Sequence, residues 1–151
     1  MSDMWQPHVT VACVIERDGR YLLVEERDKQ TAERVLNQPA GHLEPGETLL
    51  EAARRETLEE TCWQVKPIGV IGLGLYTVPG TYHTYCRTTF LAEPVEEVNN
   101  GVRDSDILAV HWMDYATLQA DSAKLRSPLV LETILRHRRG ICYPLDLIHT
   151  L

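Results

Sequence analysis

Apolar and β-branched residues concentrate in two runs near the start of the chain, over residues 8–16 and 20–27. The dipeptide Asp18-Gly19 lies between these runs, and in that setting it is typical of a β-hairpin. After a polar stretch, residues 36–47 contain two prolines and two glycines, which favour a loop or a short irregular strand. The first third of the chain is therefore predicted to form a hairpin followed by a loop or a short irregular strand.

The pattern of apolar residues changes to helical spacing after Thr48. Thr48 and Glu51 form the sequence T-x-x-E, a capping box that satisfies free backbone N–H groups at the start of a helix. The apolar residues that follow give this helix a partly buried face: Leu49, Leu50, Ala52, Ala53 and Leu58. We predict a helix over residues 49–61.

The second half of the chain again mixes strands and helices. Three β-rich runs predict strands over residues 65–80, 82–91 and 107–115, and the acidic stretch 95–106 predicts a loop. A short helix is predicted from Tyr115, and a longer one over residues 128–139. The capping signals are Asp114 or Thr117 for the short helix, and Ser127, Pro128 and Gly140 for the long one.

The order of these elements is strand, strand, loop, helix, three strands and a final long helix. Strands interrupted by helices predict an α/β or α+β domain, with a mixed sheet that carries helices on its faces. The length of 151 residues predicts one domain over residues 1–151.

Composition and charge narrow the function classes. The chain is 44% hydrophobic and 25% charged, which is typical of a globular protein. Its formal net charge of −7 argues against binding to a nucleic-acid polymer, because that requires a basic surface. A small phosphorylated ligand remains compatible with this charge, because a bound cation reverses the local field.

Cysteine spacing and the chain start bear on the compartment. The four cysteines lie in four different segments with no CxxC spacing, which favours a reduced, cytoplasmic protein. The opening MSDMWQPHVT has neither a basic region nor an apolar core typical of a secretory signal. No apolar stretch reaches the ~20 residues that a membrane helix needs, so we expect no membrane partner.

Three carboxylates crowd the end of the first predicted helix. Glu56, Glu59 and Glu60 oppose the helix dipole, and like charges at the i,i+4 spacing of Glu56 and Glu60 destabilise a helix by roughly 0.2–0.5 kcal/mol. At about 100° per residue the three side chains share one face. Oxygen ligands of this kind suit Mg²⁺ or Mn²⁺, whereas the alternative is a solvated acidic face. The start of the same helix is capped normally, so only its end breaks the usual rules of helix stability. Such a local exception in an otherwise regular element tends to mark function, which favours the metal site.

The spacing around these carboxylates resembles a known motif. Gly41, five residues, Glu47, seven residues and then Arg55-Glu56-Thr57-Leu58-Glu59-Glu60 is similar to the Nudix box, here residues 41–63. Segments before and after the box, over residues 7–148, also resemble a bacterial phosphatase group within the Nudix superfamily. The resemblance implies a Nudix-type α/β/α sandwich with a mixed sheet.

The Nudix resemblance also implies an activity and a cofactor. The expected reaction is hydrolysis of phosphoanhydride bonds in a small phosphorylated substrate, with Mg²⁺ or Mn²⁺ held by Glu56, Glu59 and Glu60. Glu59 or Glu60 is expected to take the proton of the attacking water. Gly41, Glu47 and Arg55 are expected to support the box, although Arg55 in a plain surface pair would contribute only ~0–1 kcal/mol.

The resemblance constrains the substrate and the oligomeric state less closely than it constrains the activity. The phosphatase group implies nucleoside tri- and diphosphates, and thiamin-pathway pyrimidine pyrophosphates or thiamin pyrophosphate itself. The alternatives are ADP-ribose, sugar nucleotides or dinucleoside polyphosphates, and a non-catalytic module that senses nucleotides. A monomer and a homodimer are both compatible with the sequence.

Several further residues are candidates for substrate binding. His42 follows the box glycine and either contacts phosphate or is simply exposed, and Arg87 either meets a phosphate or lies on the surface. Asp104 and Asp106 either supply a base from outside the box or belong to a solvated acidic loop. Tyr76, Tyr82 and Tyr85 either stack on a ring of the substrate or pack the sheet.

Three residues depart from the box pattern. Cys62 occupies the position of a glycine that often ends the helix in the left-handed conformation, which costs other residues roughly 1–2 kcal/mol. Thr57 replaces an aliphatic residue, and Trp63 a smaller one. These changes affect the helix end and its packing, and none of them removes a carboxylate.

Overall fold

The computed structural model describes residues 3–98 and 101–151. Strands and helices alternate along these residues in the order β1 (His8–Arg17), β2 (Arg20–Arg27), β3 (Arg34–Asn37), β4 (Ala40–His42), α1 (Leu49–Thr61), β5 (Trp63–Thr77), β6 (Thr84–Glu97), β7 (Ile107–Asp114), α2 (Tyr115–Ala120) and α3 (Pro128–Arg138). Short 3₁₀ turns follow at Ser122–Lys124 and Leu145–Leu147. None of the described helices is long and apolar enough to span a bilayer.

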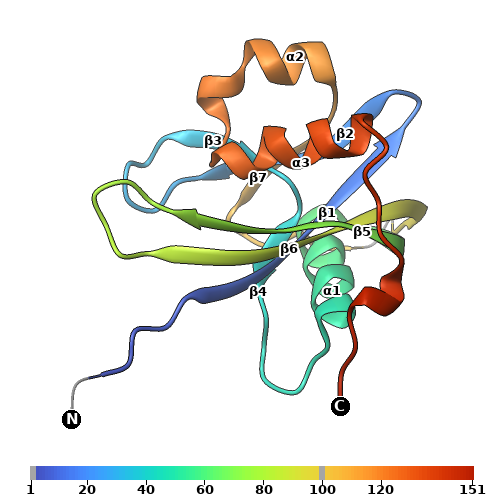
Figure 1. The fold of residues 1–151 in the computed structure, drawn as a ribbon. Coiled ribbons are helices and arrows are strands. Elements are labelled where there is room, and N and C mark those ends of the chain that lie inside the picture. The colour runs from blue at the N-terminus through green and yellow to red at the C-terminus, as the bar shows by residue number, and fades with distance from the viewer. Residues whose placement is uncertain (1–2, 99–100) are drawn as a thin grey trace.

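The seven strands form one mixed sheet, in which β1 and β6 run parallel and the other pairs run antiparallel. Residues of β1 alternate between the two faces of this sheet. Val11 and Cys13 pack toward α1, whereas Val14 packs with Val130 and Ile134 of α3. Figure 1 shows α1 on one side of the sheet and α2 with α3 on the other. The predicted α/β/α sandwich in a single domain is confirmed.

Local signals place several of these elements as predicted. Asp18 and Gly19 both have positive φ, 53° and 78°, as a tight hairpin turn requires. Helix α1 has both hydrogen bonds of the capping box between Thr48 and Glu51. Of the two proposed caps for α2, Asp114 accepts from the backbone of Thr117. Helix α3 begins with the Ser127 cap and Pro128, and Gly140 follows its end with φ 75°.

The helix end at Cys62 has the left-handed conformation that the box position requires. Its φ is 62° and ψ 15°, and its N–H donates to the carbonyl of Leu58 at 2.9 Å. The cysteine side chain is buried and lies against Gly101, so packing accompanies the unfavourable backbone angle. Thr57 is also buried, and its hydroxyl donates to the carbonyl of Ala53.

The segment 36–47, predicted as a loop or a short irregular strand, holds the end of β3 and all of β4, which pair with β2 and β1. The structure differs from the predicted elements further along the chain. Strand β6 continues to Glu97, within the predicted loop 95–106, because Glu96 and Glu97 pair with β5 and keep their side chains in solvent. Pairing outweighs the low strand propensity of these acids. Residues 99–100 of the predicted loop lie outside the described residues.

Candidate metal-binding active site

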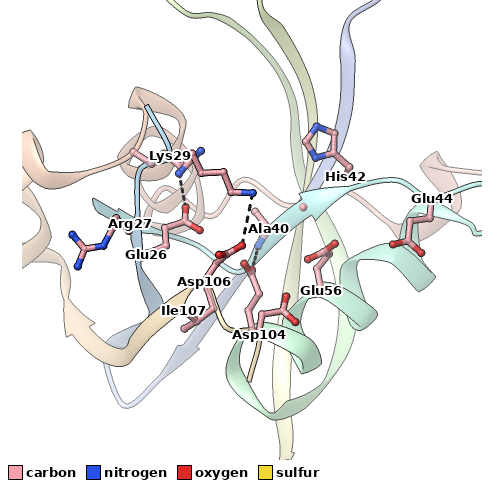
Figure 2. Close-up of a pocket in the computed structure, with 13 residues that line it drawn as sticks. Glu26, Arg27, Lys29, Ala40, His42, Glu44, Glu56, Asp104, Asp106 and Ile107 are labelled. Atoms are coloured by element: carbon pink, nitrogen blue, oxygen red, sulfur yellow. Dashed lines mark hydrogen bonds and ion pairs between the residues drawn. The ribbon is translucent and has the colours of Figure 1, made fainter. Parts of the chain in front are cut away.

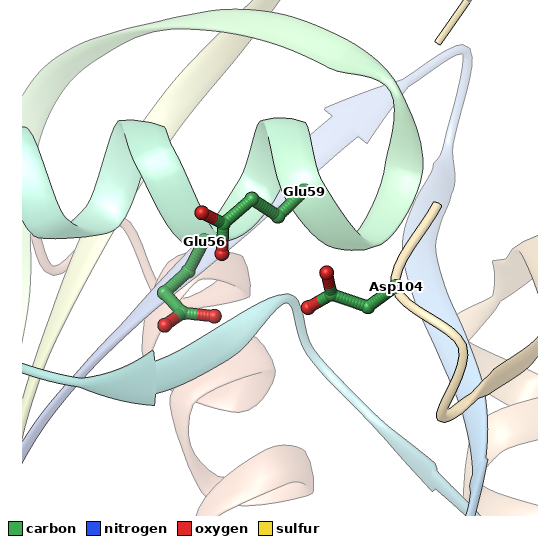
Figure 3. A group of neighbouring side chains, drawn as sticks. All are labelled: Glu56, Glu59 and Asp104. Atoms are coloured by element: carbon green, nitrogen blue, oxygen red, sulfur yellow. The ribbon is translucent and has the colours of Figure 1, made fainter. Parts of the chain in front are cut away.

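Three carboxylates from two segments converge beside the end of α1. Glu56 and Glu59 project from the helix, and Asp104 comes from the loop before β7 (Figure 3). One carboxylate oxygen from each lies within 4.8 Å of the others. The backbone N–H of Asp104 donates to the carbonyl of Glu59 at 2.9 Å, which fastens the loop to the helix. These oxygen donors suit a hard divalent cation such as Mg²⁺ or Mn²⁺.

Glu60 is not among the three carboxylates whose oxygens lie within 4.8 Å of one another, but it lines the same cavity as Glu56 and Asp104, so its role as a metal ligand stays a prediction. Its Oε1 accepts a hydrogen bond from the backbone N–H of Ala40 at 2.8 Å, and the residue is only 7% exposed. Glu60 is three residues from buried Thr57, so it lies toward the sheet rather than toward solvent. Burial, with nearby negative charges, raises the pKa of Glu60 to about 9.

Gly41 is required by the close approach of β4 to α1. A Cβ atom at this position would overlap the carboxylate carbon and both carboxylate oxygens of Glu56. The box glycine therefore leaves room for the Glu56 carboxylate, which is a steric reason for glycine that does not involve its φ.

This contact predicts the effect of Gly41→Ala. The added methyl group forces the Glu56 carboxylate out of its place, and we expect kcat/KM to fall about 10²-fold, as for a misplacement of roughly 1 Å. Steady-state kinetics with Mg²⁺ measure the loss. In a Glu56→Gln background, Gly41→Ala should lower kcat/KM little further. Additive losses would contradict the idea that Gly41→Ala acts through the Glu56 carboxylate.

Arg55 connects the box loop to the carboxylates. Its guanidinium donates twice to Glu47, at 2.9 and 2.7 Å, and also to Glu56 at 2.7 Å and Glu59 at 3.2 Å. A further bond reaches the carbonyl of His42 at 3.1 Å. Hydrogen bonds from Arg55 lower the pKa of Glu47, whereas burial raises the pKa of Glu56 despite the same cation. These are the contacts that a supporting role for Arg55 and Glu47 requires.

A cavity of about 320 Å³ opens in front of the carboxylates (Figure 2). Acidic and basic side chains both line this cavity, and the basic ones are Arg27, Lys29 and Arg126. Lys29 reaches Asp106 at 3.8 Å, and Arg126 pairs with Glu26 at 3.0 Å. Sequence reasoning missed these basic residues, because the segments around the end of β2 and before α3 carry no motif that brings them to the box. A cavity with both signs of charge suits an anionic ligand bound together with a cation.

Rings gather at the rim of this cavity. His42 is exposed and lines the cavity, and its Nε2 lies 3.3 Å from Nδ1 of His8. His8 in turn stacks on Tyr85, with 5.2 Å between ring centroids, and lies 5.9 Å from the ring of His83. Tyr82 is 88% exposed, and its carbonyl accepts from the indole N–H of Trp5.

The remaining candidates for substrate binding differ in how deeply they are buried. Asp104 joins the carboxylate group, and Asp106 lines the cavity from the same loop. The alternative that Arg87 lies on the surface is wrong, and its contact with a phosphate stays a prediction. Arg87 is only 6% exposed, and it donates to the side chains of Asn37 and Gln38 behind the cavity. It occupies an inward position of β6, which the strand alternation alone did not reveal.

A mixed sheet between helices, with a carboxylate cluster on the helix of the box, defines the Nudix class of hydrolases. Residues 4–133 match the NUDIX domain family model, and the chain belongs to this family. Members of this class hydrolyse phosphoanhydrides in small phosphorylated substrates and generally use a divalent metal ion such as Mg²⁺.

Individual relatives narrow the comparison. Phosphatase NudJ from Escherichia coli (strain K12) is 40% identical over 145 residues, which cover 96% of this chain and 92% of NudJ. A NUDIX hydrolase from Nitrosomonas europaea is 40% identical with a TM-score of 0.92, covering 97% of this chain and 98% of that one. An ADP-ribose pyrophosphatase from Streptococcus suis is 15% identical with a TM-score of 0.65, over 89% and 93% of the two chains. This last similarity concerns the fold alone.

Proposed function

We propose that the chain hydrolyses phosphoanhydride bonds of small di- and triphosphates, with Mg²⁺ or Mn²⁺ held by Glu56, Glu59 and Asp104. The observation that carries the proposal is the convergence of these three carboxylates within 4.8 Å, beside a cavity that Arg27, Lys29 and Arg126 also line. A bound divalent cation neutralises phosphate charge and makes a coordinated water more acidic. Arg55 holds two of the carboxylates in place, and Lys29 and Arg126 attract the phosphates.

Glu59 and Glu60 remain the two candidates for the group that takes the proton of the water. Glu59 has a side chain that is 43% exposed and pairs with Arg55, whereas Glu60 is largely buried, lines the cavity and accepts from the N–H of Ala40. Proton transfer by a positioned carboxylate typically contributes 10²–10⁴-fold to a rate. Replacing Glu60 with glutamine, and measuring both kcat and Mn²⁺ binding, tests whether Glu60 is the proton acceptor or a metal ligand.

For the substrate, we propose nucleoside tri- and diphosphates and thiamin-pathway pyrimidine pyrophosphates, including thiamin pyrophosphate. The similarity to a protein named phosphatase NudJ supports release of orthophosphate. The rings of His42, His8 and Tyr85 at the cavity rim support a substrate that carries an aromatic ring. The alternative substrates are ADP-ribose, sugar nucleotides and dinucleoside polyphosphates.

A substrate panel with Mg²⁺ tests this proposal. Orthophosphate is measured before and after treatment with a phosphomonoesterase, for thiamin pyrophosphate, nucleoside triphosphates and ADP-ribose. Direct orthophosphate release from thiamin pyrophosphate or nucleotides supports the first group of substrates, and release of monoesters alone supports the alternatives. Tight nucleotide binding without turnover across the panel would instead indicate a non-catalytic sensing module.

Metal removal gives a second test. A chelator is expected to abolish turnover, and Mg²⁺ at about 100 times its Kd is expected to stabilise the fold by about 2.7 kcal/mol, seen as a rise in Tm. The physical reason is that Glu56, Glu59 and Asp104 repel one another until a cation lies among them. Thermal unfolding and turnover are followed in the same Mg²⁺ titration. A titration in which neither quantity changes would contradict the metal site.

We further propose a cytoplasmic enzyme, either monomeric or homodimeric, without a nucleic-acid polymer as partner. All four cysteines are free, as is typical of a reducing compartment. The net charge of −7 disfavours a polymeric phosphate partner.

A further inference from the structure

A buried cation lies behind the cavity. Arg87 of β6 is only 6% exposed, and its guanidinium donates to two neutral amides, Gln38 at 3.0 Å and Asn37 at 3.3 Å. Its Nε has no acceptor among the described residues. Arginine is rarely buried unless it is paired, since a charge removed from water needs compensation. Burial lowers the pKa of Arg87 to about 10. The fold therefore keeps a group that stability alone does not favour.

The two amides that Arg87 contacts are held firmly from their other sides. Gln38 donates to the Val130 carbonyl of α3 at 3.0 Å and to the Thr133 hydroxyl at 2.7 Å. Asn37 donates to Glu26 of β2 at 3.3 Å. These donors fix the orientation of both amides, so that their oxygens face Arg87. Arg87 thus joins β6 to the segment between β3 and β4, and through it to α3 and β2.

The clamped segment leads directly to the carboxylates. Two residues after Gln38, the N–H of Ala40 donates to Glu60 at 2.8 Å. The next residue, Gly41, approaches the Glu56 carboxylate closely enough to exclude a Cβ atom. A shift of this backbone by a fraction of an ångström therefore displaces both carboxylates. The guanidinium of Arg87 also lies near the carboxyl groups of Glu60 and Glu26.

We propose that Arg87 is a positioning residue for the metal site, which acts by clamping the Asn37–Gly41 segment against the carboxylates of α1. This inference rests on the proposed metal-dependent function. A plain structural staple is the alternative, and it predicts that loss of Arg87 lowers stability and that activity falls only in step with unfolding.

Arg87→Met and Arg87→Lys test the proposal. We expect Arg87→Met to weaken Mn²⁺ binding, measured by electron paramagnetic resonance, about 10-fold and to lower kcat 10–100-fold, as outer partners of metal ligands do. Arg87→Lys should recover part of both losses. Arg136→Met is the matched control, because Arg136 also bridges a helix to a strand, donating to the Ile71 carbonyl at 3.1 Å away from the site.

The route through Gln38 has its own test. Gln38→Leu removes the amide that accepts from Arg87. The double variant Gln38→Leu/Arg87→Met should therefore lose little more kcat and Mn²⁺ affinity than either single variant. Additive losses would overturn the clamp. Wild-type kcat and Mn²⁺ affinity in Arg87→Met, or a loss that matches the unfolded fraction from the melting curve, would also overturn it. A wild-type protein without Mn²⁺ binding or turnover would instead remove the proposed function, and this inference with it.

Discussion

Replacing Glu56 with glutamine is expected to lower kcat/KM by about 10³-fold, equivalent to roughly 4 kcal/mol of transition-state stabilisation. Glu56 is the most enclosed of the three clustered carboxylates, with a side chain that is 15% exposed and fixed by Arg55 at 2.7 Å. Glutamine keeps the shape but removes the negative charge, so the cation is left with an uncharged amide oxygen in place of a carboxylate. Mn²⁺ affinity should fall with kcat/KM.

Glu51→Gln is the matched control for this substitution. It changes the charge of the same helix by the same amount, and glutamine retains the reciprocal bond of the capping box. Glu51 lies at the opposite end of α1 from the carboxylate cluster. A loss in Glu51→Gln comparable to that in Glu56→Gln would show that helix charge, rather than the metal site, sets the activity. Undiminished Mn²⁺ binding in Glu56→Gln would exclude Glu56 as a ligand.

The parts of the fold that local chemistry determines were predictable from sequence. The bounds of α1 follow from its cap at Thr48 and from a helix end at Cys62, and the first hairpin follows from Asp18-Gly19. The contacts of Gly41 and Arg55 also lie where the box spacing indicates. In each case the residues that decide the structure are close in sequence, or belong to one motif.

The parts that depend on distant pairing were not predictable in the same way. Asp104 was only one of several acids in a loop, and its approach to Glu59 depends on a backbone bond between segments 45 residues apart. Helical angles placed Glu60 beside Glu56, but they could not show that the sheet covers it. The charge of Arg87 suggested exposure, whereas its position on the inner face of β6 depends on the pairing of β1 with β6.

Glu60→Gln is expected to lower kcat by about 10³-fold while the protein remains folded. The substitution conserves the anchor, because the glutamine oxygen can still accept from the backbone N–H of Ala40, where Glu60 accepts at 2.8 Å. The change is therefore confined to the charge and to the ability to take a proton. Direct Mn²⁺ binding then separates the two roles. Affinity close to wild type with low kcat identifies Glu60 as the proton acceptor, and a loss as in Glu56→Gln identifies it as a ligand.

The stability of the metal-free protein gives an independent check on Glu60, because Glu60→Gln should lower kcat without lowering Tm. Burial disfavours the ionised carboxyl of Glu60, so the neutral amide should leave the Tm of the metal-free protein unchanged or raise it. The rise in Tm on adding Mg²⁺ should shrink only if Glu60 is a ligand. If Glu60 is needed for turnover although its burial costs stability, its presence is explained by catalysis and not by folding. Near-normal kcat in Glu60→Gln, or a metal-free Tm well below that of the wild type, would contradict this role.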